Sequence, residues 1–97
     1  MSDQATVGEI QVDKENLFRE ETFSDLKVAS IRRLTPVRED GSEDPDRQTM
    51  FIGETTLMSQ RGPLPVQAPI EASTLAEAFE MFPEAVNAAV EQLSEQA

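Results

Sequence analysis

The stretch TMFIGETTLMSQRGPLPVQAPIEA, residues 49–72, contains two limbs that can fold back on each other around residues 60–62. In the second limb apolar residues at even positions alternate mainly with prolines at odd positions: Leu64, Val66, Ala68 and Ile70 against Pro63, Pro65, Gln67 and Pro69. This period of two is typical of a strand that buries one face. Alternate strand residues direct their N–H and C=O groups to opposite neighbours, so the prolines remove donors on one side only. The limb is therefore predicted to be an edge strand whose outer side resists strand addition, with an ordered proline-rich linker as the alternative.

The first limb of this hairpin carries apolar residues at both parities, which is typical of a middle strand. Gly62 can adopt a positive φ in a short loop because it has no Cβ. A register symmetric about residue 61 places Ile52 opposite Ile70 and Met58 opposite Leu64, and a bulge would shift these pairs by one. We expect the even-numbered face of this limb to lie beneath a helix.

Residues 25–37, DLKVASIRRLTPV, are rich in β-forming residues and predict the first strand of the sheet. Apolar residues again occur at both parities, so this strand is either covered on parts of both faces or interrupted by a bulge. Residues 38–48 are acidic and rich in turn-forming residues, which predicts a long exposed connection between the first strand and the hairpin.

The amino-terminal residues 1–16 are polar and acidic, and they are predicted to be a disordered tail. Leu17, Phe18 and Phe23 follow among charged residues and are too apolar to remain in water, so we expect them to dock on the sheet. Residues 17–97 are expected to form a single domain with one modest core, because a chain this short buries only about 60–65% of its surface.

From Thr74 onward the apolar period becomes helical. Thr74 and Glu77 match a capping box, in which each side chain accepts a backbone N–H of the helix start. The apolar stripe that follows has spacings of three and four residues: Leu75, Phe79, Phe82, Val86, Val90 and Leu93. Pro83 leaves the stripe in phase, so the helix is expected to be kinked or broken there. The predicted fold class is α+β: a three-stranded antiparallel β-meander with one face covered by this C-terminal helix, β-β-β-α in chain order.

The composition excludes several kinds of chemistry. The chain has no cysteine and no histidine, so a disulfide framework, a thiolate metal site and a cysteine nucleophile are excluded. Its formal net charge is −11, from 19 acidic and 8 basic side chains, and this field repels nucleic-acid phosphates and anionic lipids. We see no signal-peptide pattern and no apolar run long enough to span a membrane. We therefore expect a cytoplasmic protein without a cofactor, nucleic-acid partner or membrane attachment, and a salt-rich cytoplasm is one hypothesis for its acidity.

The acidic loop, residues 39–46, has some features of a calcium site. Its oxygen-bearing side chains occupy alternate positions, as in an EF-hand loop: Asp40, Ser42, Asp44 and Asp46. The sixth position is Pro45, where an EF-hand requires glycine, and the twelfth is Phe51, where a bidentate glutamate belongs. A solvated, turn-rich loop is the favoured interpretation, with weak cation binding by the three aspartates as the alternative.

Arg32 and Arg33 lie in the only basic segment and are the candidate anion site. Neighbouring strand residues point to opposite faces, so the two guanidinium groups are not expected to grip one phosphate together. Cross-strand ion pairs, for example with Glu54, are the more common outcome.

Glu54 shares the parity of Ile52 and Met58 and is expected on the face beneath the helix. A lone buried carboxylate could serve as a general acid or base, whereas a bulge at Gly53 or an arginine partner would remove that role. The chain has no histidine, cysteine or tyrosine to complete a catalytic group, and neither a glycine-rich phosphate loop nor G-x-S-x-G. We therefore expect that it is not an enzyme.

The second face of the sheet predicts an interaction. If the helix covers the even-numbered face, Ala29, Ile31, Phe51 and Leu57 remain on the other, and contiguous exposed apolar surface usually marks a binding site. Three interpretations stay open: the N-terminal segment covers this face, two copies pair through it, or another protein docks there. Coverage within the monomer is favoured, and homodimerisation is next, since the first strand is an unblocked edge.

The segments NLFREETFSDLKVASIRRLTPV, residues 16–37, and GPLPVQAPIEASTLAEAFEMFPEAV, residues 62–86, resemble small bacterial proteins known only as hypothetical cytoplasmic proteins. The resemblance implies a cytoplasmic location and carries no functional residues. The expected function is a non-catalytic protein-interaction or accessory module that uses its sheet face or first-strand edge, with itself or another protein as partner. The alternative is a protein that binds a small anion through Arg32 and Arg33, or a cation through residues 39–46.

Overall fold

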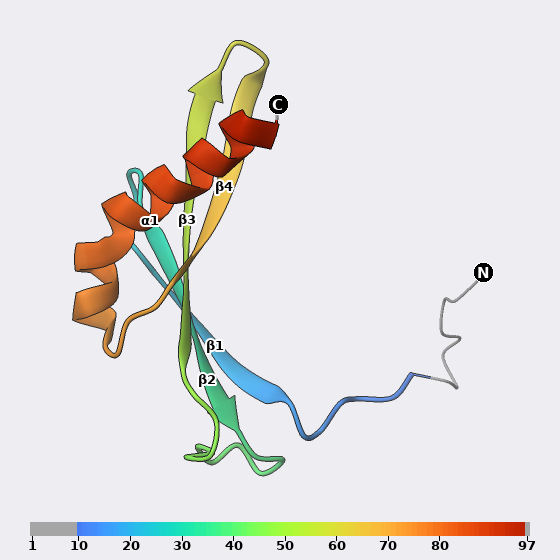
Figure 1. Cartoon of the computed structure of the whole chain (residues 1–97). Helices are drawn as coiled ribbons and strands as arrows, with labels where there is room; N and C mark the ends of the chain where they lie inside the picture. Colours follow the sequence, from blue (N-terminus) through green and yellow to red (C-terminus); the bar gives the residue numbers. More distant parts are fainter. Residues whose placement is uncertain (1–9, 97) are drawn as a thin grey trace.

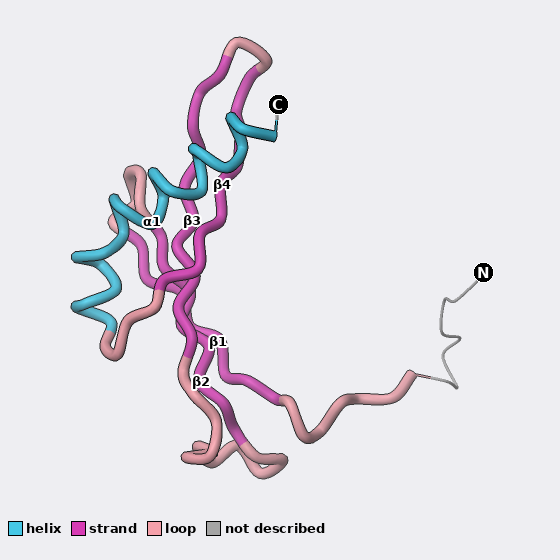
Figure 2. Tube along the Cα trace, in the orientation of Figure 1, coloured by secondary structure: helices cyan, strands magenta, loops and turns pink. Residues whose placement is uncertain are grey.

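The computed structural model describes residues 10–96 as a four-stranded antiparallel sheet with one helix on one of its faces (Figure 1). The strands lie side by side in chain order, and the elements are β1 (Leu17–Ser24), β2 (Ser30–Val37), β3 (Met50–Ser59), β4 (Gly62–Ile70) and α1 (Leu75–Gln96). The predicted α+β class, the antiparallel sheet and the C-terminal helix are confirmed. Of the tail predicted to be disordered, residues 1–9 lie outside the described residues, and residues 10–16 contain no helix or strand (Figure 2).

The sheet has four strands rather than the predicted three, because residues 17–24 form an edge strand. β1 pairs with β2 along its whole length, from Leu17 to Ser24. Three of its eight residues are charged, but the charge is balanced across the ladder, since Glu21 lies directly opposite Arg33. The apolar residues at 17, 18 and 23 therefore belong to the sheet and do not dock on it from outside.

The β3–β4 hairpin has a register that differs by one residue from the symmetric prediction. Ser59 pairs with Gly62 across a two-residue loop, so Phe51, and not Ile52, lies opposite Ile70. Gly62 adopts a φ of 108°, a left-handed value that glycine accepts without strain. The shift places the odd-numbered residues of β3 on the same face as the even-numbered residues of β4. The prediction that the even-numbered face of β3 lies beneath the helix is therefore wrong.

The prolines of β4 decide which backbone groups form the β3–β4 ladder. The two strands pair along the whole of β4, although Pro63, Pro65 and Pro69 have no N–H to donate. In an antiparallel ladder, residue pairs that exchange two hydrogen bonds alternate with pairs that exchange none. The proline-containing pairs must be the non-bonded ones, so the even residues of β4 bond to the odd residues of β3. β4 is thus the predicted edge strand, and Gln67 has the one N–H left on its outer side between residues 63 and 69.

The core lies between α1 and one face of the sheet. Its buried residues come from three strands and the helix: Ile31, Phe51, Val66, Ala68, Ile70, Ala78 and Val86. The predicted burial of the even residues of β4 is confirmed for positions 66, 68 and 70, whereas Leu64, nearer the hairpin tip, is 39% exposed. The apolar stripe of α1 faces this core, with Phe79 and Leu93 at its exposed margins.

The helix begins as the sequence predicted. Thr74 Oγ1 accepts the N–H of Glu77 at 3.1 Å, and Glu77 Oε1 accepts the N–H of Ser73 at 2.6 Å. α1 is continuous through Pro83 and changes direction in its middle part, as Figure 1 shows. It is therefore a single bent helix and not two abutting ones.

Candidate functional site

The face of the sheet opposite α1, which we call the open face, is covered by no other helix or strand within residues 10–96. It carries the even-numbered side chains of β1, β2 and β3 and the odd-numbered side chains of β4. Its apolar side chains include Leu34, Met50, Ile52, Met58, Pro65 and Pro69. Met50 is 43% exposed and Met58 is 78% exposed. The open face is therefore the candidate interaction surface of this fold.

A single polar row crosses the open face from β1 to β4. Arg32 Nη1 lies 3.6 Å from Glu20 Oε1, and Arg32 Nη2 lies 3.7 Å from Glu54 Oε2. Gln67 donates from Nε2 to Glu54 Oε2 at 2.9 Å. Glu20 and Glu54 are the two carboxylates at open-face strand positions, and they share one guanidinium group. The rest of this face carries no ionised strand residue.

Glu54 is not the lone buried carboxylate that acid–base chemistry would need. The ladder is unbroken at Gly53, which pairs with Ala68, so no bulge redirects the next residue. The one-residue register shift instead places Glu54 on the open face, where its side chain is 31% exposed and lies beside Arg32. The arginine partner that sequence reasoning proposed as an alternative is the one observed.

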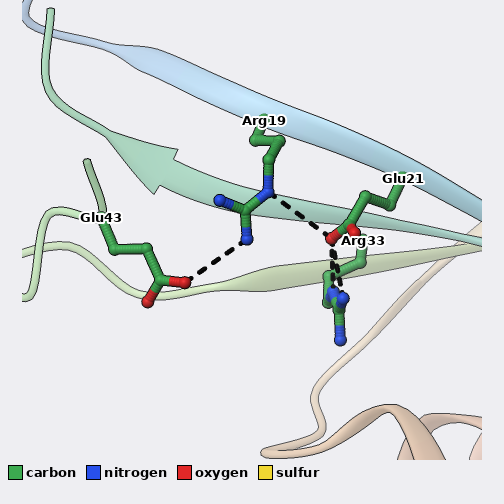
Figure 3. A network of polar contacts seen from close by, with 4 residues as sticks. All are labelled: Arg19, Glu21, Arg33 and Glu43. Carbon is green, nitrogen blue, oxygen red and sulfur yellow. Dashed lines mark hydrogen bonds and ion pairs between the residues drawn. The ribbon is translucent and has the colours of Figure 1, made fainter. Parts of the chain in front are cut away.

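A second polar network lies on the face that carries α1 and joins β1, β2 and the loop before β3 (Figure 3). Arg33 donates from Nε and Nη2 to Glu21 Oε1 at 3.0 and 2.7 Å. Arg19 Nε lies 3.8 Å from the same oxygen, and Arg19 Nη2 lies 3.4 Å from Glu43 Oε2. The hydrogen bond from Arg33 is the main reason that the pKa of Glu21 lies below its ordinary value, and the charges of both arginines add to the effect.

The two arginines considered as an anion site point to opposite faces, as predicted. Arg32 pairs with carboxylates on the open face, and Arg33 pairs with Glu21 on the helix side. Sequence reasoning missed that Arg19 and Arg33 converge on one carboxylate. The signal was the i, i+2 spacing of Arg19 and Glu21, which puts both on one face once β1 is recognised as a strand.

Two of the three aspartates of the acidic loop, Asp40 and Asp44, accept hydrogen bonds from the loop itself. Asp40 Oδ1 accepts the Oγ–H and the N–H of Ser42 at 2.7 and 3.0 Å, and these bonds lower the pKa of Asp40. Asp44 accepts the N–H of Asp46 and the Nε–H of Arg47, both at 3.0 Å, which lowers the pKa of Asp44. Within the described part of the chain, no group of three metal-ligating side chains is placed to hold an ion.

Arg47 anchors this loop to the end of the sheet, a contact that sequence reasoning missed. Its Nη2 donates to the carbonyl oxygens of Leu17 and Val37 at 3.0 and 2.8 Å. Its guanidinium carbon lies 5.1 Å from the centroid of the Phe18 ring. The connection between β2 and β3 is therefore folded back on the strands, although most of its residues are exposed as predicted.

The four residues expected on the uncovered face do not lie there. Ile31 and Phe51 are 0% and 3% exposed beneath α1, and Leu57 packs against the core cluster of Val66, Ala68 and Val86. Ala29 lies in the β1–β2 loop. The reason is the register of β3, because a shift of one residue moves every side chain of a strand to the opposite face.

The open face ends in a groove where β2 stops and β3 continues. The groove has a volume of about 420 Å³ and lies between the β1–β2 loop, residues 25–29, and the β3–β4 hairpin. Its lining includes Leu26 and Val28 from the loop and Thr56 and Pro65 from the hairpin. Sequence reasoning could not find this groove, because it did not identify the β1–β2 hairpin.

Within residues 10–96, no helix is long and apolar enough to cross a membrane. The outer side of α1 is acidic, and the helix contains no lysine or arginine. No protein-family model matches the chain, and searches of the curated proteins and of the solved structures found no significant similarity.

Proposed function

We propose that this protein is a small, non-catalytic interaction or accessory module that binds a protein partner through the open face. The proposal is carried by the uneven distribution of charge. The open face has two carboxylates at its strand positions, in a chain with 19 acidic residues. The β2–β3 loop and α1 hold much of the remaining acidity: Glu39, Asp40, Glu43, Asp44 and Asp46, and Glu77, Glu80, Glu84 and Glu91.

The composition of the open face resembles that of a protein–protein interface. The cores of protein–protein interfaces are depleted in charge and enriched in aromatic residues, methionine and arginine. The open face combines Met50, Met58 and Arg32 with few other ionised groups, and the guanidinium group of Arg47 lies over Phe18 at its edge. Methionine adapts its shape to a partner at low cost. Four strands about 4.8 Å apart and about six residues long offer roughly 400 Å², which is small for a permanent complex and suits a transient one.

The outer edge of β1 supports homodimerisation as a second candidate. β1 contains no proline, and the bond from the N–H of Asp25 to the carbonyl of Ala29 implies that its even residues direct their backbone groups outward. In a symmetric antiparallel pairing about Glu20, Arg19 of each copy would face Glu21 of the other. The same pairing would bring the two Glu20 carboxylates together on the axis, so docking at the open face ranks first.

Site-specific photo-crosslinking in cells tests the proposal. A photoreactive residue at Met50, on the open face, is expected to capture a defined partner protein. The same residue at Glu84, on the outer side of α1, is the matched control and is expected to capture none. A chain-to-chain adduct from Thr22 of β1 would favour the edge dimer. Equal capture from Met50 and Glu84, or none from Met50, would contradict binding through the open face.

A further inference from the structure

The groove at the end of the open face is bordered by the last part of β3. On the side that faces β2, the backbone of this part of β3 has no strand partner within residues 10–96. β2 pairs with β3 no farther than Glu54, which lies opposite Ser30, whereas β3 continues to Ser59. The odd residues of β3 bond to β4, so the even residues direct their N–H and C=O groups the other way. Beyond the end of β2, this free flank of β3 presents the backbone groups of Thr56 and Met58.

The β1–β2 loop is held away from the free flank by its own hydrogen bonds. Asp25 Oδ1 accepts three consecutive backbone N–H groups, those of Lys27, Val28 and Ala29, at 2.8, 3.0 and 3.1 Å. Leu26 adopts a φ of 59° and donates its N–H to Ser24 Oγ at 2.8 Å. These bonds occupy N–H groups that a longer β2 could have offered to β3. The groove is therefore a fixed gap in the sheet, bridged by a bond of 2.6 Å from Thr55 Oγ1 to the carbonyl of Val28.

The loop also presents apolar side chains beside the gap. Leu26 is 91% exposed and Val28 is 70% exposed, and Met58 of the hairpin is 78% exposed. The left-handed region is unfavourable for leucine because its Cβ crowds the following carbonyl. A bulky residue in this conformation is uncommon. Here the conformation leaves an apolar side chain exposed next to an unpaired strand.

Charge limits what the groove can bind. Residues 55–70 contain no acidic residue and include Arg61, while Lys27 lines the groove from the loop side and Glu54 lines it at the end of β2. The groove therefore suits an extended segment that has apolar residues at alternate positions and an acidic residue at the end that lies beside Lys27 and Arg61. Thr56 and Met58 each offer one N–H and one C=O to such a segment.

The N-terminal segment of this same chain has the required composition. Ile10 and Val12 alternate with polar residues and are 65% and 63% exposed. Glu9 and Asp13 flank them in the sequence. We propose that residues 10–13 of one copy add as a strand to the free flank of β3 in a second copy, and that the exchange is reciprocal. Two chains then form a dimer by exchanging arms, in addition to the partner that the open face binds.

The arm of a chain is too short to reach the groove of that chain. Residue 10 lies seven residues before Leu17, and a fully extended chain of that length spans at most about 25 Å. Leu17 starts β1 opposite Val37, seven residues along β2 from Ser30, and Thr56 lies two residues farther along β3. At about 3.3 Å per residue, the separation along the strands alone is about 30 Å. Figure 1 shows residues 10–16 leaving from the end of β1 that lies away from the β1–β2 loop.

Sedimentation equilibrium of the full chain tests the arm exchange, between about 10 µM and 500 µM protein and with about 0.5 M KCl to screen repulsion. The average mass is expected to rise from the monomer value of 10.7 kDa towards twice that value. The variant with Ile10→Asp and Val12→Asp, and the variant Met58→Asp, are each expected to dimerise at least tenfold more weakly. Met50→Asp is the matched control, because it changes an exposed methionine on the same strand and face, but one that pairs with Leu34 of β2 and lies outside the free flank. It is expected to dimerise normally.

A mixing experiment identifies the contact directly. The arm variant keeps an intact groove, and the Met58→Asp chain keeps an intact arm. Adding unlabelled Met58→Asp chain to the ¹⁵N-labelled arm variant is expected to shift the amide signals of Thr56 and Met58. Unchanged signals, a wild-type chain that stays monomeric throughout, or an arm variant that dimerises as the wild type does would each overturn the proposal. Failure of Met50 to capture a partner in cells bears on the open face and leaves these outcomes unaffected.

Discussion

Gly53 lies tightly against the ring of Phe82: a Cβ at this position would lie 3.0 Å from Cδ2 and 3.1 Å from Cε2 of the ring, and 3.0 Å from Cδ1 of Ile70. Gly53 is flanked in the sheet by Ile31 of β2 and Ala68 of β4. The ring of Phe82 therefore lies over the one position between them that has no side chain. Pro83 follows directly, which places this contact at the proline of α1. The contact lies on the face that the register of β3 turns towards the helix, opposite the open face.

Gly53→Ala is therefore expected to destabilise the fold by about 1–3 kcal/mol, the usual cost of overpacking a core. At an ordinary strand position the same change would stabilise by about 0.5–1 kcal/mol. Urea unfolding measures the difference. In a Phe82→Leu background the smaller side chain should relieve the part of the cost that comes from the ring, while the contact with Ile70 Cδ1 at 3.0 Å remains. An equal loss in both backgrounds would show that the ring is not a cause.

Leu26→Gly is expected to raise the free energy of unfolding by about 0.5–1 kcal/mol, because glycine accepts the left-handed conformation that strains leucine. Leu26→Ala removes the side chain beyond Cβ but keeps the Cβ atom that causes the strain. It is therefore the matched control and should bring no such gain. Both variants should weaken dimerisation, because both remove the exposed side chain. Equal stability of the two variants, measured by urea unfolding, would contradict the strain.

The carboxyl group of Glu21 is expected to titrate below its ordinary pKa of 4.5 in the folded protein. Carbon-detected NMR titration measures this value directly. Arg33→Gln should raise the pKa of Glu21 more than Arg19→Gln does, because the hydrogen bond from Arg33 is the largest cause of the shift. A larger rise in the Arg19 variant would contradict the network of Figure 3.

The pKa values of Glu21, Asp25, Asp40 and Asp44 are all lowered in the folded protein. A carboxyl with a lowered folded pKa contributes stability that is fully present above its unfolded pKa and is lost as the pH falls through its folded pKa. The unfolded values are near 4.5 for glutamate and 3.8 for aspartate. The free energy of unfolding should thus fall progressively below about pH 4.5. Asp25→Asn should flatten part of this fall, and a slope unchanged in that variant would contradict the role of Asp25 in holding the β1–β2 loop.

Glu84→Lys is expected to stabilise the protein by about 0.5–1 kcal/mol, because it replaces a like-charge i, i+4 pair with Glu80 by an attractive one. Glu84→Gln should give about half of this gain. Both gains should shrink in molar KCl, where charges on the surface are screened, and the melting temperature of the wild type should rise over the same range. A wild-type melting temperature that stayed flat or fell would contradict the view that the acidity suits a salt-rich environment.

The parts of the fold that were predicted correctly are those that depend on a local pattern of residues. The alternation of β4, the positions of its prolines and the helical stripe from Leu75 each depend on neighbours in the chain. β1 was missed because two of the residues on its helix side, Arg19 and Glu21, are charged and break the apolar alternation. Their charges are balanced only when Arg33 of β2 is known to lie opposite Glu21. The register of β3 was missed by one residue because it depends on the length of the hairpin loop, two residues rather than three.

The candidate site was less predictable than the fold. The choice of open face follows from the register of β3, and the groove follows from the point at which β2 ends. The loop that follows this end is held by the three backbone N–H groups that donate to Asp25, a loop geometry that no periodic pattern encodes. The separation of Arg32 from Arg33 was predictable, because it requires only that they be neighbours in a strand.

The face assignment of β3 supports both proposals, and thiol labelling tests it most directly, because the chain has no cysteine of its own. Single variants Met50→Cys and Phe51→Cys place a thiol on each face of the strand at adjacent positions. The structure predicts that the thiol at position 50 reacts at the rate of an exposed group and that the thiol at position 51 is protected until the protein unfolds. Rapid labelling at position 51 together with protection at position 50 would contradict the account.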